Sequence, residues 1–142
     1  MSNEINYNDI EVGAEIPPLS KLPTTRQLVM WAGASRDFVE MHYDKDVAVA
    51  RGLDGVIVHG ALKASFLGQL ITDWIGKSGI LKRFKCRYQA VDYPGEEILC
   101  KGQVTKKYIE AGKHLIDCEV WTENPRGEKT TTAIATIELV NV

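Results

Sequence analysis

Residues 60–76, GALKASFLGQLITDWIG, form a nearly continuous apolar stretch, and this stretch constrains the fold more than any other part of the chain. At 3.6 residues per turn, its apolar side chains cover almost the whole circumference of a helix. Only a narrow polar strip around Lys63, Gln69 and Asp73 remains. A helix of this kind is wrapped by other structure instead of lying on a surface. The sequence therefore predicts a buried central helix that ends at the glycines after residue 75.

After residue 79 the apolar period changes from 3.6 to 2, which indicates strands. Four strands are predicted, within residues 84–90, 98–104, 116–120 and 131–139, with turns at 94–96, 111–112 and 124–127. Joined in series, they would form an antiparallel meander with one apolar face, and the central helix is the obvious partner for that face. The expected class is α+β, with a curled antiparallel sheet wrapped around one long helix. A ferredoxin-like fold is the alternative, but it needs helices between the strands, and no helical pattern follows residue 79.

The part of the chain before the central helix predicts shorter elements. The first twenty residues, which contain the pair Pro17-Pro18, predict an extended lead-in. Residues 24–33 predict a short helix with a threonine cap at its start and Gly33 at its end. Its apolar side would consist of Leu28, Val29 and Trp31. Asp44 and its neighbours predict a second short helix that reaches Ala50. We expect residues 1–142 to form a single domain, as their number suggests.

Composition excludes several classes of protein. The net charge is −2 and the basic residues are scattered, so no nucleic-acid surface is expected. Residues 1–7 lack the pattern of a signal peptide, and no stretch approaches the ~20 apolar residues that a membrane span requires. Cys86, Cys100 and Cys118 show no metal-ligand spacing and are expected to be buried thiols of a cytoplasmic protein.

Asp37 and His42 form a candidate acid/base pair. On a continuous helix, five residues advance about 500°, which would leave the two side chains about 140° apart. They converge only if residues 38–41 turn, and the irregular polarity of this segment is compatible with a turn. A histidine exchanges protons near neutral pH, and a carboxylate beside it orients a water molecule. Without the turn, both residues are ordinary solvated loop residues.

His59 and Gly60 stand at the start of the predicted central helix, after the short apolar run 56–58. A helix N-terminus presents unpaired N–H groups, and Gly60 has no Cβ to keep a ligand away from its own. Donors placed in this way stabilise a carbonyl oxygen that gains charge during a reaction. In the alternative interpretation, Gly60 only permits a sharp entry into the helix and His59 caps it.

These residues occur in an order that resembles one family. Ser35-Arg36-Asp37, His42 and Asp44, followed by Val58-His59-Gly60 and Ala64-Ser65, resemble the MaoC-like dehydratases. This family includes (R)-specific enoyl-CoA hydratases and the bacterial hydroxyacyl dehydratases of fatty-acid elongation. The similarity extends from near Ile10 through the turn at residues 93–96. It implies the hot dog fold, usually as a dimer.

The resemblance also assigns roles to individual residues. It implies that Asp37 and His42 are the catalytic pair and that Gly60, next to His59, supplies the backbone donor to a thioester carbonyl. Ser35 and Ser65 match positions near the site, although Ser65, beside Ala61 and Ala64, also fits a small packing residue. No metal and no dissociable cofactor are implied, since CoA or acyl carrier protein is part of the substrate.

The chain departs from the family pattern at the loop. Val39 and Glu40 stand where the family usually has Asn-Pro, Arg36 replaces a common Gly, and Ala61 replaces a frequent Met. The first pair removes a polar side chain and a rigid, turn-setting residue. These differences bear on the shape of the loop and on the substrate class.

The leading hypothesis is reversible hydration of a trans-2-enoyl thioester to a 3-hydroxyacyl thioester with (R) stereochemistry. The expected partners are the acyl thioester and a second copy in a homodimer or larger homo-oligomer, with a heterodimer with another hot dog chain as the alternative. In that second hypothesis the chain is a subunit with little activity alone. A thioesterase is the third, and it needs a carboxylate on the central helix, where the only acid is Asp73.

Overall fold

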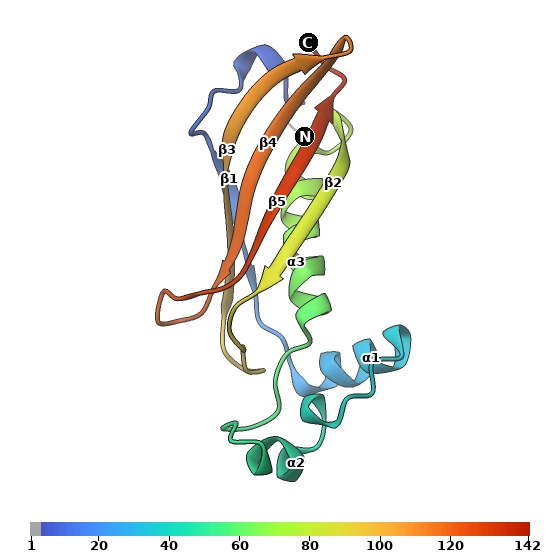
Figure 1. The fold of residues 1–142 in the computed structure, drawn as a ribbon, viewed down its shortest axis with the longest axis vertical. Coiled ribbons are helices and arrows are strands. Elements are labelled where there is room, and N and C mark those ends of the chain that lie inside the picture. Colours follow the sequence, from blue (N-terminus) through green and yellow to red (C-terminus); the bar gives the residue numbers. More distant parts are fainter. Residues whose placement is uncertain (1–3) are drawn as a thin grey trace.

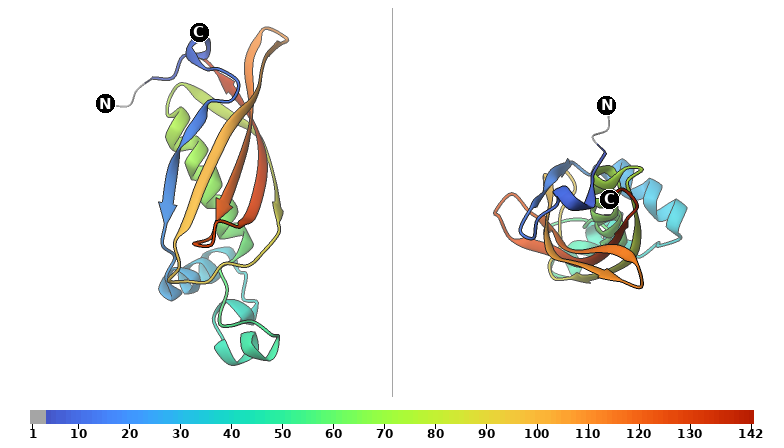
Figure 2. Two further views of the ribbon diagram at one scale, coloured as in Figure 1. Left: turned by 90° about the vertical axis from the view of Figure 1, so that its left-hand side faces the viewer. Right: turned by 90° about the horizontal axis from the view of Figure 1, so that it is seen from above.

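The computed structural model describes residues 4–142, so the start of the segment that argues against a signal peptide lies outside it. Five strands form one antiparallel sheet that curls around a central helix (Figure 1, Figure 2). The strands are β1 (Glu15–Lys21), β2 (Gly79–Tyr88), β3 (Ile98–Glu110), β4 (Lys113–Glu123) and β5 (Lys129–Leu139). The helices are α1 (Thr25–Ser35), α2 (Lys45–Ala50) and α3 (Gly60–Ile75), with single 3₁₀ turns at Tyr7–Asp9 and Glu40–His42.

The central helix α3 confirms the main prediction from the sequence. It ends at Gly76, whose N–H donates to the Thr72 carbonyl. Leu67 and Ile71 are completely buried against the inner face of the sheet, where alternate side chains point toward the helix. One residue of the predicted polar strip is an exception, because Lys63 is buried. Its ammonium group is satisfied by partners far along the chain, described below.

The sheet has one strand more than the sequence predicts. The segment expected as an extended lead-in contains β1, which pairs with β3 and buries Ile16. The register of this pairing shifts between Ile16 and Leu19, across Pro17 and Pro18. The two prolines lack N–H donors and interrupt the alternation, which is why the pattern did not indicate a strand.

The strand order also differs from a simple meander. Strands β3, β4 and β5 follow one another as predicted, but β2 pairs with β5 instead of β3. Residues 89–97 therefore cross the end of the sheet from one side to the other (Figure 1). Both Gln89 and Ala90 donate to the Thr130 carbonyl at the start of this crossing. Such long-range pairing is not visible in local periodicity.

The remaining elements agree closely with expectation. Thr24 caps α1 by accepting from the Gln27 N–H, and Asp44 caps α2. The end of α1 differs, because the helix runs past Gly33 to Ser35 and Arg36 takes the left-handed conformation. Its apolar side also differs: Leu28 and Ala32 are buried, whereas Val29 is exposed.

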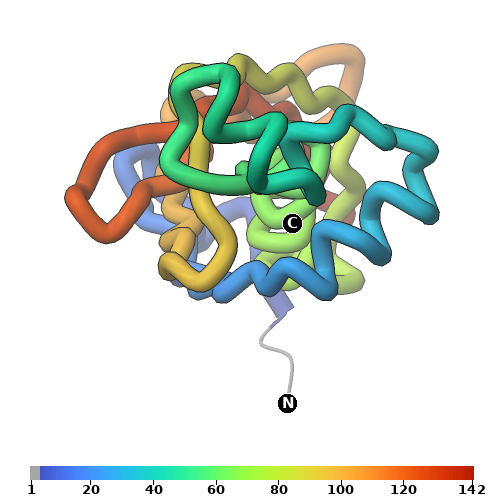
Figure 3. The backbone as a smooth tube through the Cα atoms, turned by 90° about the horizontal axis from the view of Figure 1, so that it is seen from below, coloured from blue at the N-terminus to red at the C-terminus, as the bar shows by residue number. Residues whose placement is uncertain are grey.

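Helices α1 and α2 and the turn between them lie beyond the end of the sheet, across the N-terminal end of α3 (Figure 1, Figure 3). Cys100 and Cys118 are buried free thiols, as predicted, and burial raises the pKa of each to about 12; Cys86 is half-buried. Among residues 4–142, no helix has both the length and the apolarity to cross a membrane.

Candidate active site

The structure brings Asp37 and His42 together. The chain turns at Glu40–His42, with the His42 N–H donating to the Val39 carbonyl, and His42 Nε2 lies 3.9 Å from Asp37 Oδ2. The imidazole is buried, whereas the carboxylate is partly open to solvent. The turn on which the sequence hypothesis depended is therefore present.

The Asp37 carboxylate is oriented by its own loop. Its Oδ1 atom accepts a hydrogen bond from the Val39 N–H, which leaves Oδ2 facing the imidazole. On the other side, the Asp37 N–H donates to Ser35 Oγ. The contact at position 39 uses the main chain, so replacement of the family's usual Asn by Val does not remove it.

A main-chain contact sets the proton position on His42. Nδ1 lies 2.8 Å from the Ile57 carbonyl oxygen, which can only accept, so Nδ1 carries the proton. In the neutral ring, Nε2 then presents a lone pair toward the carboxylate. The 3.9 Å gap is too long for a direct hydrogen bond, and two acceptors that face each other can share a water molecule that donates to both.

His59 stacks on the His42 ring, with centroids 3.7 Å apart and planes 20° from parallel. Its Nε2 donates to the Asp37 carbonyl oxygen at 3.3 Å, while Nδ1 is buried without a partner among residues 4–142. Burial, followed by the nearby His42, lowers the pKa of His59. His59 is therefore neutral at pH 7. It contacts both members of the pair, since its ring stacks on His42 and its Nε2 donates to the main chain of Asp37. His59 occupies the N-cap position of α3, as the alternative interpretation has it, but its side chain makes no capping bond to the helix.

Gly60 is the first residue of α3. The N–H groups of Leu62 and Lys63 both donate to the His59 carbonyl. The first N–H of a helix, here that of Gly60, has no partner within the helix. A Cβ at Gly60 would lie 3.1 Å from carbons of the Tyr88 ring. The missing side chain thus leaves room for the Tyr88 ring.

The two serines that match family positions are both exposed. Ser35 Oγ donates to the Trp31 carbonyl and accepts from the Asp37 N–H, so it touches the loop of the catalytic pair. Ser65 Oγ donates to the Ala61 carbonyl on the surface of α3. The structure connects Ser35 directly to Asp37 and shows no such link for Ser65 among the described residues.

A buried ion pair beside Gly60 was missed by sequence reasoning. Lys63 and Asp92 are each only 2% exposed, and Lys63 Nζ lies 2.9 Å from Asp92 Oδ2 and 2.8 Å from the Ala90 carbonyl oxygen. The Asp92 carbonyl accepts from the Val58 N–H. These contacts hold the crossing segment, residues 89–97, against the N-terminal end of α3. A single lysine in an apolar turn of the helix was a sign of a buried charge, but its partner 29 positions later could not be inferred from the local sequence.

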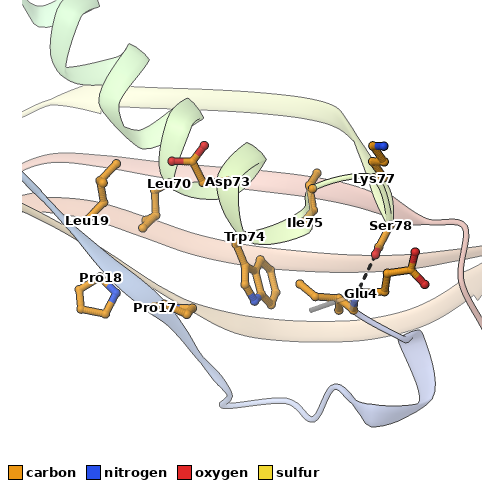
Figure 4. A pocket seen from close by; sticks show the side chains of 12 residues that line it. Glu4, Pro17, Pro18, Leu19, Leu70, Asp73, Trp74, Ile75, Lys77 and Ser78 are labelled. Atoms are coloured by element: carbon orange, nitrogen blue, oxygen red, sulfur yellow. Dashed lines mark hydrogen bonds between the residues drawn. The ribbon is translucent and has the colours of Figure 1, made fainter. Parts of the chain in front are cut away.

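An apolar-lined hollow lies at the other end of α3 (Figure 4). It has a volume of about 520 Å³ and is bounded by Trp74 and Leu70 of the helix and by Pro17 and Pro18 of β1. Asp73 also lines it. At 1.5 Å per residue, Asp73 lies about 20 Å along the helix from Gly60. The only acid of α3 is therefore remote from the oxyanion candidate, which does not favour the thioesterase hypothesis.

Asp37, His42 and His59 also lie close enough to suggest a metal site, with one possible ligand atom of each within 4.8 Å of the others. Zinc requires about 2.0–2.1 Å to each nitrogen. The lone pairs of two stacked rings lie in separate, nearly parallel ring planes about one ring thickness apart, so they do not converge on one ion. Chelation would require the rings to separate. We retain chemistry without a metal as the prediction.

Comparison with known proteins decides the family. The family model described as a MaoC like domain matches residues 10–124, which include every site residue named above. The chain belongs to the MaoC-like family. Its curled sheet and central helix are the hot dog fold, as the resemblance implied.

Individual relatives extend this result. The chain is 32% identical over 128 residues to the 3-oxo-4,17-pregnadiene-20-carboxyl-CoA hydratase beta subunit of Mycobacterium tuberculosis, covering 90% of this chain and 94% of that protein. It matches a chain of the ChsH1–ChsH2 complex from the same organism with a TM-score of 0.79 and 29% identity, over 91% of this chain and 98% of that one. An (R)-hydratase from A. caviae, involved in PHA biosynthesis, gives a TM-score of 0.83 at 25% identity, over 92% and 98%.

Proposed function

We propose that this MaoC-like protein reversibly adds water to a trans-2-enoyl thioester, forming a 3-hydroxyacyl thioester. The observation that carries the proposal is the facing of His42 Nε2 and Asp37 Oδ2 across 3.9 Å, against the ring of His59, the residue that immediately precedes α3. A base, a water site and an oxyanion donor are the three requirements for conjugate addition of water beside a thioester carbonyl.

The proton transfers follow from the tautomer of His42. A water molecule that donates to Asp37 and His42 presents its oxygen to the β-carbon of the substrate. As the new C–O bond forms, His42 Nε2 accepts one proton, and the electron pair of the double bond moves through the α-carbon to the thioester oxygen. The enolate then returns its electrons to the α-carbon, which takes the proton from His42. One water is consumed, and the reverse sequence is the dehydration.

The thioester oxygen carries negative charge only during the reaction. Under this proposal the Gly60 N–H donates to it, aided by the partial positive charge of the α3 N-terminus. Loss of one such donor in other enzymes costs roughly 3–4 kcal/mol of transition-state stabilisation. The proposal includes (R) stereochemistry, CoA or acyl carrier protein as the thiol of the substrate, and no additional cofactor. The matched (R)-hydratase supports this stereochemistry.

The test follows the loss of enoyl-CoA absorbance by the wild type and by Asp37→Asn and His42→Asn. We expect both substitutions to lower kcat about 10²–10⁴-fold, the usual contribution of a positioned acid or base. Asp73→Asn, on α3 at the distant cavity, is the control carboxylate and should keep the wild-type rate. Equal rates for wild type and Asp37→Asn would overturn the proposal. Release of free thiol from saturated acyl-CoA would instead support a thioesterase.

A second candidate differs in assembly, and the relatives favour it. One relative is named as the beta subunit of a hydratase, and another similar chain was crystallised as part of a two-component complex. The chain would then be one subunit of a hydratase that pairs with a different hot dog chain. Activity that appears only on co-expression with such a chain would support this candidate. Full activity of the purified homo-oligomer would contradict it.

A further inference from the structure

The ion pair of Lys63 and Asp92 takes no part in the proton transfers proposed above, and it lies where charges are unfavourable. Both side chains are only 2% exposed. Removal of two charges from water costs so much that a buried pair often stabilises a fold no better than apolar side chains of the same volume. Stability is therefore a weak explanation for this pair, and its surroundings offer another.

The pair joins α3 to the segment that crosses the end of the sheet. Lys63, in the first turn of α3, donates to the Ala90 carbonyl and to Asp92 Oδ2, so it holds the crossing segment at two points. The main-chain carbonyl of Asp92 then accepts from the Val58 N–H at 2.8 Å. The pair thereby fixes the backbone just before His59 and the start of α3.

Ile57 connects this backbone to the catalytic turn. Its N–H donates to the Met41 carbonyl at 3.1 Å, and its carbonyl accepts from His42 Nδ1 at 2.8 Å. Both backbone groups of Ile57 therefore bond to the turn that carries His42, whereas the N–H of Val58 bonds to Asp92. Residues 57–58 are held from two sides.

The resulting path is continuous and buried. It leads from Lys63 to Asp92, from the Asp92 carbonyl to Val58, and from the Ile57 carbonyl to His42, and all five residues are buried. Hydrogen bonds in such an interior are stronger than in water, because the local dielectric constant is low. The last bond of the path places the proton on Nδ1 of the catalytic histidine.

We infer that Lys63 and Asp92 are positioning residues for His42. The ion pair fixes the Ile57 carbonyl, which keeps the proton on Nδ1 and leaves Nε2 directed at the water site. The expected effect on rate rests on the proposed hydration, whereas the expected effect on the tautomer of His42 does not. Neither side chain of the pair contacts the reacting atoms under this inference.

Two variants separate positioning from stability. Asp92→Asn keeps an oxygen that accepts from Lys63 Nζ, but it leaves the ammonium group buried without an opposite charge, which lowers stability. Lys63→Met/Asp92→Asn contains no buried charge and recovers stability, but it deletes both bonds of Nζ. We expect Asp92→Asn to be the less stable protein and the double variant to be the slower enzyme. A merely structural pair would give the same order in both properties.

The rate is measured with enoyl-CoA and normalised to folded protein. We expect kcat of the double variant to fall about tenfold, within the ~10²-fold that a misplacement of ~1 Å can cost, and kcat of Asp92→Asn to stay within about twofold of wild type. KM should change less than about twofold in both variants, because a group that acts only in the transition state lowers kcat and kcat/KM equally.

The tautomer is measured without substrate, by ¹⁵N NMR of protein labelled in the histidine rings. A neutral ring has one nitrogen that donates and one that accepts, and the two differ in ¹⁵N shift. His42→Asn assigns the signals of His42 among the three histidines. At a pH of about 8, above the ordinary histidine pKa, we expect a single Nδ1–H tautomer in wild type and in Asp92→Asn, and exchange between tautomers in the double variant.

The matched control is Lys101→Met/Glu123→Gln, which removes the ion pair between β3 and β4 with the same change of charges. It should keep the wild-type kcat and tautomer. If the double variant does not fold by circular dichroism, Lys63→Met/Asp92→Leu replaces it, since apolar groups of similar shape can replace both partners of a buried pair.

A wild-type kcat together with a single His42 tautomer in the folded double variant would overturn the inference. An equal fall of kcat in Asp92→Asn or in the control would do the same. If the wild type has no activity on enoyl-CoA, the proposed function fails, and the tautomer of His42 in the double variant decides the positioning role by itself.

Discussion

The two ends of α3 differ in almost every property. At the N-terminal end, three side chains that bear chemistry are packed together, and a buried ion pair fastens the loop beside them. At the C-terminal end lies a cavity of about 520 Å³ with Trp74 at its wall and little that titrates beyond exposed carboxylates and a lysine. The comparison shows that a spacious hollow of a subunit need not contain its reactive groups. Geometry among polar atoms, instead of volume, identifies the site.

The largest expected effect is on the ion pair that holds the N-terminal end. Replacement of Lys63→Met leaves the Asp92 carboxylate buried and unpaired, so we expect a loss of about 3–5 kcal/mol in the free energy of unfolding. Urea titration measures it. Adding Asp92→Asn should restore most of the loss, because no buried charge remains. Lys113→Met, which removes an exposed pair with Glu138, should cost under about 1 kcal/mol. An equal loss of unfolding free energy in Lys63→Met and Lys113→Met would contradict the distinction between the buried and the exposed ion pair.

A smaller effect is expected at the tip of the helix. Gly60→Ala places a Cβ 3.1 Å from the Tyr88 ring, which must move, and narrows the approach to the proposed donor. We expect kcat/KM to fall about 10–100-fold, somewhat less than the 10²–10³-fold typical of a deleted oxyanion donor. Gly68→Ala is the control in the same helix, since its Cβ would meet open space, and it should raise stability by up to about 1 kcal/mol. An unchanged kcat/KM in Gly60→Ala would show that Gly60 does not contribute to the site.

The pH dependence of stability tests the burial of His59. Its pKa is lowered in the folded protein, so the unfolded chain binds more protons below the ordinary pKa of 6.5. Stability from the neutral ring is complete above pH 6.5 and is lost as the pH falls toward the lowered pKa. One proton limits this slope to about 1.4 kcal/mol per pH unit. His59→Asn should flatten the slope in chemical denaturation between pH 7 and pH 5, and an equal slope in both proteins would contradict the assignment.

The smallest effect is expected at the distant cavity. Trp74→Ala enlarges this hollow, which lies about 20 Å along α3 from Gly60. We therefore expect kcat/KM for a short enoyl-CoA to change less than about twofold, well below any catalytic contribution of a positioned group. Steady-state assays normalised to folded protein measure it. A larger loss would mean that the two ends of α3 are coupled.

Much of the fold was predictable because its signals are local. The apolar segment at residues 60–76 predicted α3, and the alternation after residue 79 predicted four strands. Strand β1 was missed because Pro17 and Pro18 interrupt its pattern, and the position of β2 was missed because its partner β5 lies more than forty residues away. Tertiary pairing decides such features, and local periodicity does not record it.

The candidate site shows the same division. The sequence left the convergence of Asp37 and His42 conditional on a turn at residues 38–41, and the structure contains that turn. The burial of Lys63 could not be predicted from its place in the polar strip, because a helix pattern assigns a face but cannot locate Asp92. The stacking of His42 on His59 was likewise outside reach, since it depends on how the loop folds back onto the tip of α3.

The proline pair of β1 has a consequence for the open margin of the sheet. Strand β1 forms one border of the sheet, and neither Pro17 nor Pro18 has an N–H group to donate to a further strand. A strand that tried to extend the sheet here would therefore form a broken ladder. The proline pair protects this margin against growth into open-ended ribbons.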